Sequence, residues 1–202
     1  MRQEAFGQKK LTFVDRFGVY LSQEPIFKVV RSYQHPSLLD IGCGYQAHLL
    51  QNLRPLIEQG VGVDVQINPS ARTIPNLSFY EQPIEQAFDQ LKGQAFDIVM
   101  MVSVLEHLVE PLDVLRACYG LLKPGGTLIL NVPNWRGKFF LELSAFKLGL
   151  SPAYEMDDHK MYYDKRDLWP LLVRAGFKPS LIHLKYHKFS LNLFATAQKG
   201  KK

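Results

Sequence analysis

Short, nearly continuous apolar runs alternate along the chain with longer stretches in which apolar residues recur at helical spacing. Continuous runs of Val, Ile, Leu and Met are typical of parallel strands that are buried on both faces of a sheet. The alternation of such strands with helices predicts an α/β sandwich. The runs lie at residues 37–41, 60–65, 77–80, 96–102 and 127–132. The helices are expected at residues 47–58, 84–92, 111–122 and 165–175, with a further helix around 27–33.

Two further apolar runs, at residues 181–186 and 190–197, are separated by only a few residues. Parallel neighbours need a crossover of a dozen or more residues, whereas antiparallel neighbours need only a turn. We therefore expect a C-terminal hairpin. The predicted fold is a doubly wound sheet of seven strands, mostly parallel, with this antiparallel hairpin at one end.

Two helix boundaries can be placed from local composition. Lys123-Pro124-Gly125-Gly126 combines a cation, a proline and two glycines, and we expect it to end one helix before the strand at 127–132. Asp164 is a predicted N-cap of the last helix, with Asp167 in the first turn, where the helix dipole favours a carboxylate.

The length of 202 residues suits one domain, 1–202. Residues 1–36 are interpreted as an N-terminal extension and residues 134–163 as an insert. In the insert, Phe139, Leu143, Phe146 and Leu150 recur at helical spacing. This stripe either packs on the domain or forms a lid over a substrate, and the sequence leaves both interpretations open.

The cysteines and the charge set the expected environment. Cys43 and Cys118 form neither a CxxC pair nor a Cys/His cluster, so no metal site is expected and the predicted location is the reducing cytoplasm. Residues 1–10 contain no apolar stretch of the kind a signal peptide needs, and no run reaches the ~18–20 apolar residues of a transmembrane helix. The net charge of +5 leaves nucleic acid or peripheral membrane contact open, although the terminal lysines, Lys199 among them, are expected to be solvated.

The first strand runs into a glycine turn, Leu38-Leu39-Asp40-Ile41-Gly42-Cys43-Gly44, and a helix follows. Glycines let the backbone approach a ligand closely. Asp64 ends the second strand, 20 residues beyond Gly44, where an acid can bind both hydroxyls of a ribose. The alternative for Asp64 is an N-cap for the turn at Asn68.

Asp40 helps to decide which of two kinds of nucleotide ligand the turn binds. A carboxylate two residues before the first glycine would repel the pyrophosphate of a dinucleotide, but it could help to hold a zwitterionic, cationic ligand. The turn therefore suits a methionine-like tail better than a nicotinamide cofactor.

Together these segments resemble the class I S-adenosylmethionine-dependent methyltransferases, and specifically their small-molecule branch. The glycine turn is similar to the first motif of that family, and Asp64 matches its ribose-binding acid. The segments FDIV…SVLEHL at 96–108, LLKPGGTL at 121–128 and 159–177 resemble the following motifs in the same order. The resemblance spans roughly residues 36–198 and implies a Rossmann-like fold, with S-adenosylmethionine as donor and S-adenosylhomocysteine as product.

The resemblance also implies the residues that hold the donor. The methionine end is expected on the glycine turn, the ribose on Asp64, the adenine beside the ends of the second and third strands, and the methionyl amino group at the end of the fourth. These residues are Asp40, Gly42, Cys43, Gly44, Asp64, Val65, Gln82, Pro83, Ile84, Val102 and Ser103. One departure is Gln46, which stands where the family usually has a third glycine. Gln46 either crowds the turn or lies over the ligand carboxylate.

His107 is the candidate general base, because it follows the fourth strand near the expected sulfonium and imidazole titrates in the useful range. The alternative is that Glu106 and His107 brace the turn. Candidate acceptor contacts are Asn134, Trp135, His159 and Tyr162. His159 and Tyr162 could instead fix the insert on the core.

The expected partner is a small-molecule, lipid-linked or sugar-linked acceptor methylated on oxygen or nitrogen. The sequence lacks the (Asp/Asn)-Pro-Pro-aromatic motif after the fourth strand, which argues against methylation of nucleic-acid bases. A catalytically silent donor-binding partner subunit and an RNA-modifying methyltransferase stay as alternatives, and a nicotinamide dehydrogenase is a more distant one.

Overall fold

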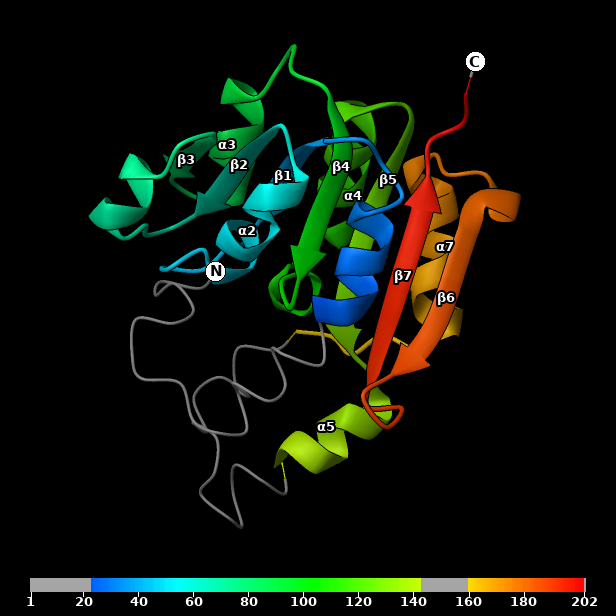
Figure 1. Cartoon of the computed structure of the whole chain (residues 1–202). Coiled ribbons are helices and arrows are strands. Elements are labelled where there is room, and N and C mark those ends of the chain that lie inside the picture. The colour runs from blue at the N-terminus through cyan, green and yellow to red at the C-terminus, as the bar shows by residue number, and fades with distance from the viewer. Residues whose placement is uncertain (1–22, 143–159, 202) are drawn as a thin grey trace.

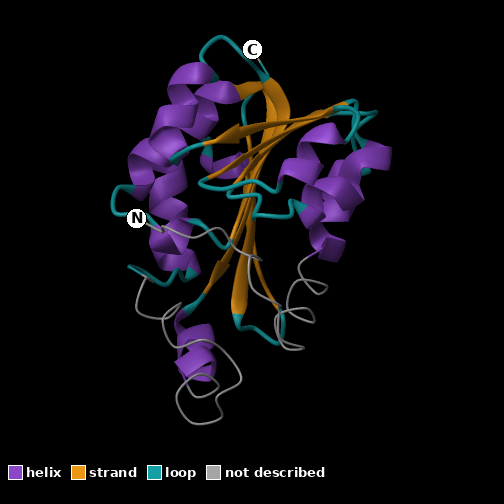
Figure 2. Ribbon diagram, turned by 90° about the vertical axis from the view of Figure 1, so that its left-hand side faces the viewer, coloured by secondary structure: helices purple, strands orange, loops and turns teal. Residues whose placement is uncertain are grey.

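A computed structural model describes residues 23–142 and 160–201 of the chain. Its centre is a seven-stranded sheet with the strand order β3-β2-β1-β4-β5-β7-β6. Helices cover both faces of this sheet (Figures 1 and 2). The strands are β1 (Ser37–Ile41), β2 (Gln59–Asp64), β3 (Leu77–Glu81), β4 (Phe96–Val102), β5 (Leu122–Pro133), β6 (Ile182–His187) and β7 (Asn192–Gln198).

The predicted fold class is confirmed. Strands β1 to β5 pair in parallel, whereas β7 is antiparallel to both β5 and β6. Pro133, at the carboxyl end of β5, lies opposite Asn192, at the start of β7. The turn between β6 and β7 therefore lies at the same edge of the sheet as the carboxyl ends of the parallel strands.

Two apolar layers hold the helices on the sheet. One layer packs α3 (Ile84–Gln90), α4 (Pro111–Leu121) and α7 (Lys165–Ala175) against one face. The other layer packs α2 (His48–Leu53) and the helix that includes residues 23–30 against the opposite face. Helix α5 (Trp135–Glu142) follows β5 at the carboxyl edge (Figure 1). Residues of the predicted insert stripe from Leu143 onward, and His159, lie outside the described residues.

The helix expected over residues 47–58 is shorter than predicted. It divides into α2 and a 3₁₀ turn, Arg54–Leu56. Pro55 lies within that turn. Proline has no amide hydrogen and cannot continue the α-helical ladder, which explains the change.

The stop predicted at Lys123–Gly126 is wrong in one respect, because these residues belong to β5, which begins at Leu122 directly after α4. Gly125 takes a left-handed φ of 81°, and the ladder between β4 and β5 shifts register between Phe96 and Ile98. The Gly125 amide also donates to the carbonyl of Lys199 at 2.9 Å. Cross-strand pairing has thus turned a local stop pattern into the start of a strand.

Lys199 is not the solvated tail residue that the sequence suggested. Its ammonium donates to the carbonyls of Tyr119 and Leu122, at 2.9 and 2.7 Å. These carbonyls lie at the end of α4, so a cation satisfies acceptors that the helix leaves open. At the start of α7, by contrast, the predicted cap is confirmed: Asp164 and Asp167 form a capping box.

The amino edge of the sheet is fastened by a small polar network. One carboxylate oxygen of Asp97 accepts bonds from the amide of Ser37 (2.9 Å), the hydroxyl of Ser37 (2.7 Å) and the ammonium of Lys123 (2.7 Å). These bonds join the starts of β1, β4 and β5. None of the helices within residues 23–142 and 160–201 has the length and apolar character that a membrane crossing requires.

Candidate functional site

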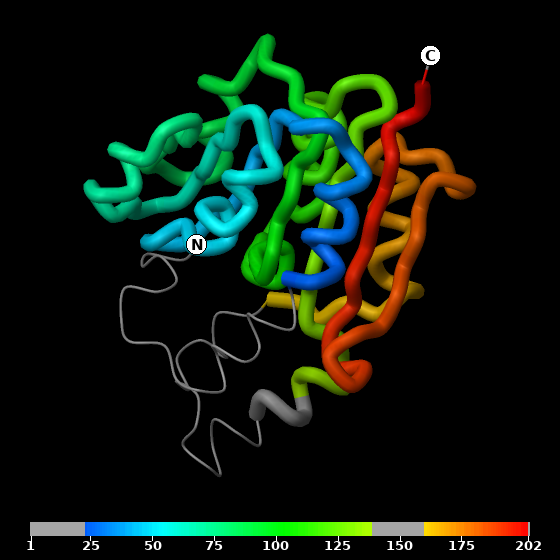
Figure 3. Tube along the Cα trace, in the orientation of Figure 1, coloured from blue at the N-terminus to red at the C-terminus, as the bar shows by residue number. Residues whose placement is uncertain are grey.

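The parallel strands bring the predicted donor residues to one edge. Gly42 follows β1, Asp64 ends β2, Gln82 follows β3 and Ser103 follows β4. In the order of the sheet these ends are neighbours, because β2, β1 and β4 are adjacent. Figure 3 shows the chain turning back at this lower edge after β4, where the turn between β6 and β7 also lies.

The glycine turn is held in a shape that only glycine accommodates well. Gly42 and Gly44 have left-handed φ values of 75° and 78°. The amides of Gly42 and Cys43 both donate to the Val63 carbonyl, at 2.8 and 3.1 Å. A Cβ atom on Gly42 would lie 2.3 Å from Cγ2 of Val104. The turn is therefore fixed by both conformation and packing.

Asp64 connects the glycine turn to β2. Its carboxylate accepts the amide of Gly44 at 2.7 Å and the amide of Val65 at 2.8 Å. The alternative role as a cap for the turn at Asn68 is wrong, because the Asn68 side chain itself accepts the Ser70 amide at 3.0 Å. Asp64 is only half-buried, and a carboxylate oxygen can accept more than one hydrogen bond, which is the capacity that ribose hydroxyls would need.

Asp40 is a buried carboxyl beneath the turn, with 2% of its surface exposed. Burial, together with the nearby charge of Asp64, raises its pKa from 3.8 to about 8. A carboxyl in this state is mainly neutral at pH 7. A cationic ligand beside it would favour the carboxylate and lower its pKa again, so the site is suited to a positively charged group.

Gln82 presents an unused donor at the other end of the site. Its Nε2 is buried and has no hydrogen-bond partner within the described protein, although its Oε1 accepts from Gln90 at 2.9 Å. A buried amide donor without a partner is costly. The ring nitrogens of adenine are acceptors and would satisfy it. Pro83 and Ile84, both half-buried, follow directly and lead into α3.

Two residues of the turn have structural roles. The thiol of Cys43 is buried against β2, where a Cβ atom on Gly62 would lie 2.9 Å from its sulfur. The Oε1 of Gln46 accepts the side-chain amide of Asn68 at 2.9 Å. Gln46 thus connects the glycine turn to the loop after β2, a role that neither sequence interpretation included.

The segment after β4 carries the candidate base. Val102 ends the strand, and Ser103 has a left-handed φ of 56°, with its amide donating to the Asn131 carbonyl at 2.8 Å. A 3₁₀ turn, Leu105–His107, follows and places half-buried His107 near the carboxyl edge. Glu106 beside it is almost fully buried, at 1% exposed.

The predicted acceptor contacts lie at the end of β5. Asn134 is buried, and its side chain donates to the Ser190 carbonyl (2.8 Å) and accepts the Gly137 amide (2.8 Å). The Trp135 ring lies 5.7 Å from the Tyr162 ring, and its indole donates to Asp167 at 3.3 Å. Tyr162 is buried here, as expected if it fixes the insert on the core. Direct contact of these residues with an acceptor stays a prediction.

The sequence analysis missed a polar cluster around the turn between β6 and β7. Burial, with the charges of Lys188 and Lys185, lowers the pKa of His187 to about 4, and its Nε2 donates to Oδ1 of Asn131 at 2.5 Å. Burial raises the pKa of Tyr163 to about 12, with Glu106 and Asp167 adding to this effect. Burial lowers the pKa of Lys188 to about 8, against the opposing influence of Glu106. The cluster joins residues that are more than 50 positions apart, so no local pattern predicts it.

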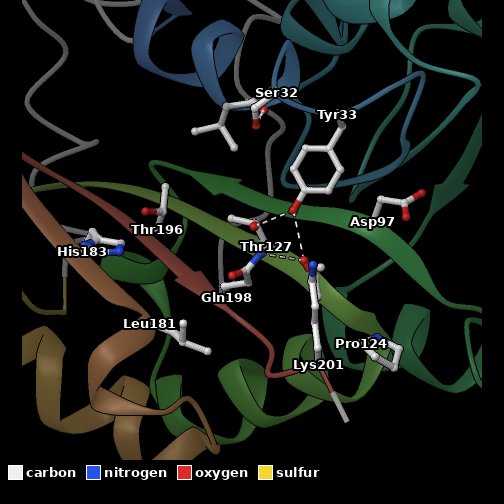
Figure 4. Close-up of a pocket in the computed structure, with 13 residues that line it drawn as sticks. Ser32, Tyr33, Asp97, Pro124, Thr127, Leu181, His183, Thr196, Gln198 and Lys201 are labelled. Atoms are coloured by element: carbon white, nitrogen blue, oxygen red, sulfur yellow. Dashed lines mark hydrogen bonds between the residues drawn. The ribbon is translucent and has the colours of Figure 1, made fainter.

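A separate hollow of about 470 Å³ lies away from this edge (Figure 4). Its polar groups are largely used by one another: the Tyr33 hydroxyl contacts Oγ1 of Thr127 at 2.7 Å, and Gln198 donates to the Gly125 carbonyl at 2.9 Å. Asp97, Pro124 and Lys201 also line it. Since these residues surround the amino ends of β4 and β5, we assign the hollow no part in the donor site.

Comparison with known proteins identifies the family of the chain. A family model described as a methyltransferase domain matches residues 9–182. The ubiquinone biosynthesis O-methyltransferase of Albidiferax ferrireducens is 33% identical over 112 residues, which is 52% of this chain and 44% of that protein. The protein of the same name from Acinetobacter baylyi is 26% identical over 134 residues, which is 61% of this chain and 56% of that protein. The chain thus spans about half the length of these curated relatives.

Solved structures show the same fold. The magnesium protoporphyrin IX methyltransferase of Synechocystis PCC 6803, with bound S-adenosylhomocysteine, has a TM-score of 0.67 at 19% identity, with 96% of this chain and 91% of that chain covered. A methyltransferase of Archaeoglobus fulgidus has a TM-score of 0.62 at 17% identity, with 93% and 100% covered.

The sheet order, the glycine turn and the groups at its edge fit one ligand with a cationic end, a ribose and an adenine. Asp40 suits the cation, Asp64 the ribose hydroxyls and Gln82 the adenine. The family model covers most of the chain, including all of these residues. The chain belongs to the class I S-adenosylmethionine-dependent methyltransferase family.

Proposed function

We propose that this chain transfers the methyl group of S-adenosylmethionine to a hydroxyl of a small-molecule acceptor. The observation that carries the proposal is the common edge at which the donor residues of β1 to β4 meet His107 on the turn after β4. The names of the curated O-methyltransferase relatives support oxygen as the methylated atom.

The donor, when bound, supplies an activated methyl group on a sulfonium whose carbon–sulfur bond breaks with its electron pair going to sulfur. The chain's own residues align the acceptor oxygen with that carbon, which alone can provide much of the rate. His107 accepts the hydroxyl proton as the new carbon–oxygen bond forms. Asp40 would hold the cationic end of the donor, and Asp64 would hold its ribose.

Thermal unfolding with S-adenosylmethionine, S-adenosylhomocysteine, NAD or no ligand tests the donor assignment. A ligand at ~100 times its dissociation constant stabilises a protein by about 2.7 kcal/mol. We expect a rise of several degrees with the two sulfur compounds and none with NAD. A shift with NAD alone would support a dehydrogenase instead.

The role of His107 separates an enzyme from a silent donor-binding subunit. His107→Gln should lower methyl transfer to an accepted substrate by ~10²–10⁴-fold, which is the usual contribution of a general base, and leave S-adenosylhomocysteine affinity within about twofold. Unchanged turnover would remove His107 as base. Steeply salt-dependent RNA binding by the wild-type chain would instead favour an RNA-modifying enzyme.

We also propose peripheral contact with anionic membranes when the acceptor is lipid-linked. Phe189 and Trp135 are 85% and 46% exposed near the carboxyl edge, and exposed Arg136 and Lys185 lie on the same elements. Aromatic and cationic side chains together favour a negatively charged lipid surface. Co-sedimentation with anionic and neutral vesicles tests this, and Phe189→Ser should weaken the anionic binding. Equal binding of the variant would contradict it.

We place the chain in the cytoplasm, a proposal supported by its two buried free thiols, Cys43 and Cys118. A reducing compartment keeps such thiols reduced. Fractionation of cells that express the chain checks this location.

A further inference from the structure

The turn between β6 and β7 has an unusual backbone. Lys188, Phe189 and Ser190 are consecutive and have left-handed φ values of 49°, 56° and 64°. Left-handed conformations are unfavourable for residues with a Cβ atom, and they normally occur singly. Three in succession, without a glycine, persist only where surrounding structure holds them, and such strain is most common at functional sites.

The surrounding structure holds this turn from β5. Before the turn, His187 is bonded to Asn131 at 2.5 Å. After it, the Asn134 side chain bonds the Ser190 carbonyl at 2.8 Å and the Asn134 amide bonds the Leu191 carbonyl at 3.1 Å. Gly137 lets α5 approach closely, because a Cβ atom there would lie 2.2 Å from the Leu191 carbonyl oxygen. Both ends of the turn are therefore fixed relative to the carboxyl edge.

In this conformation two neighbouring side chains differ in their exposure to solvent. Phe189 is 85% exposed, whereas Lys188 is half-buried and interacts electrostatically with Glu106. Glu106 precedes His107, the proposed base, on the 3₁₀ turn after β4. The strained turn thus fixes Lys188 at the carboxyl edge of the sheet, the edge that also carries the proposed base.

Glu106 cannot use the whole hydrogen-bonding capacity of that ammonium. A protonated lysine has three N–H donors, and bonds from an ammonium to carboxylate or phosphate oxygens are among the strongest in proteins. Burial lowers the pKa of Lys188 to about 8 while Glu106 opposes that shift, so the ammonium is mostly charged at pH 7 and its N–H donors are suited to an anion.

We propose that Lys188, held at the carboxyl edge by the β6–β7 turn, binds an anionic oxygen group of the acceptor, a carboxylate or a phosphate, and so selects anionic acceptors. This inference rests on the proposed function, because it concerns the acceptor of that same site. It adds a specificity-determining residue that lies 81 positions after His107 in the sequence.

Binding of three probes of similar shape tests the proposal: benzoate, phenyl phosphate and the neutral benzamide. Dissociation constants are measured by NMR titration on the full chain, with and without saturating S-adenosylhomocysteine. We expect at least one anion to bind about tenfold or more tightly than benzamide. The stronger of the two anions identifies the preferred group. Equal affinities for all three probes, or no binding of either anion, would overturn the proposal.

Variants locate the preference on Lys188. Lys188→Met should reduce the anion-to-benzamide ratio to about one, and Lys188→Arg should restore most of it. Lys185→Met is the matched control, because Lys185 is an exposed lysine on the same hairpin, and it should keep the wild-type ratio. A wild-type ratio in Lys188→Met, or an equal loss in Lys185→Met, would reject the assignment.

Glu106→Gln removes a carboxylate that competes for the ammonium but that also raises the pKa of Lys188, so the variant is measured at pH 6, where Lys188 is more fully protonated than at pH 7. If Lys188 binds the anion, anion binding at pH 6 should be at least as strong as in the wild-type chain, and weaker anion binding than wild type at that pH would contradict the proposal. S-adenosylhomocysteine affinity, measured first for every variant, reports separately on the proposed function. If that ligand fails to bind the wild-type chain, the donor assignment fails, while the probe series without it still tests Lys188.

Discussion

The proposed donor end and the proposed acceptor end of the carboxyl edge are built in opposite ways. At the donor end, Asp40, Gly42, Gly44 and Asp64 lie within 25 residues of one strand–turn–helix–strand unit, and backbone amides provide most of the contacts. At the acceptor end, the polar cluster of Glu106, Asn131, Asn134 and Lys188 comes from three separate segments and depends on side chains. A site formed by contiguous residues can bind the same donor throughout a family. A cluster of side chains from separate segments can be changed residue by residue to suit a different acceptor.

The largest expected effect falls on the donor end. Gly42→Val should abolish measurable S-adenosylhomocysteine binding, a loss of more than about 100-fold or ~3 kcal/mol, because its Cβ would overlap Val104 at 2.3 Å and its φ is left-handed. Isothermal titration calorimetry measures this loss. Gly120→Ala is the control, since a Cβ there meets nothing within 4 Å. Retained binding in Gly42→Val would show that the turn does not contact the donor.

Asp64→Ala should have the next largest effect. It removes the acceptor of the Gly44 and Val65 amides as well as the expected partner of the ribose, so S-adenosylhomocysteine binding should weaken by about 1–3 kcal/mol. Asp64→Asn keeps one acceptor oxygen and should lose less. The same titration measures both variants, and unchanged affinity in Asp64→Ala would remove this residue from the site.

Donor binding should be linked to the proton on Asp40. With its pKa at about 8, Asp40 is protonated at pH 7 in the free chain, and a cationic ligand should expel that proton. Affinity for S-adenosylhomocysteine, whose amino group is cationic, should therefore rise between pH 6 and pH 8. Calorimetry in two buffers of different ionisation enthalpy detects the released proton. Asp40→Asn should abolish this release, and a pH-independent affinity would contradict the linkage.

The same residue predicts how stability depends on pH. The folded chain keeps the Asp40 proton that the unfolded chain loses above about pH 4. The contribution of Asp40 to the free energy of unfolding should therefore decrease as the pH rises from about 4 to about 8. Denaturant unfolding of wild type and Asp40→Asn at these two pH values measures it. The variant should lack that decrease, and equal pH slopes would contradict it.

A change at the acceptor end should leave the donor end intact. Asn134→Ala should lower the free energy of unfolding by about 1–3 kcal/mol, because it leaves the half-buried Ser190 carbonyl and the buried Gly137 amide without this partner. S-adenosylhomocysteine affinity should stay within about twofold. The exposed Asn52 provides the matched alanine control. A large loss of donor affinity in Asn134→Ala would mean that the two ends are coupled.

The smallest expected effect is at the opposite edge of the sheet. Partial burial alone would raise the pKa of Asp97, but bonds from Lys123 and Ser37 outweigh it and lower the pKa. Asp97→Asn should cost up to about 1 kcal/mol of stability near pH 7, and less as the pH falls and the wild-type carboxylate is protonated. Urea unfolding at pH 7 and pH 3 measures this difference. A larger cost at pH 3 would contradict the ion-pair explanation.

The sequence predicts the donor end better than the acceptor end, because the donor end is formed by contiguous residues. The apolar runs predict the buried parallel strands, and the glycines at and after Gly42 predict the turn. The role of Gln46, the bonds of Lys199 and the position of Lys188 each depend on a residue distant in sequence. The sequence predicts the strand at 127–132 but misses its start at Leu122, because Leu122 pairs with Phe96 and Gly125 bonds Lys199, both distant in sequence.

The antiparallel direction of β7 has a practical consequence for experiments on single molecules. Because β7 runs away from the carboxyl edge, residues 199–201 return beside Gly125 and Gly126 at the far side of the sheet (Figure 1). A dye, biotin or surface tether attached at residue 201 would therefore point away from the glycine turn and from the β6–β7 turn. Ligand exchange could then be watched on immobilised molecules with the entire reactive edge facing the solution.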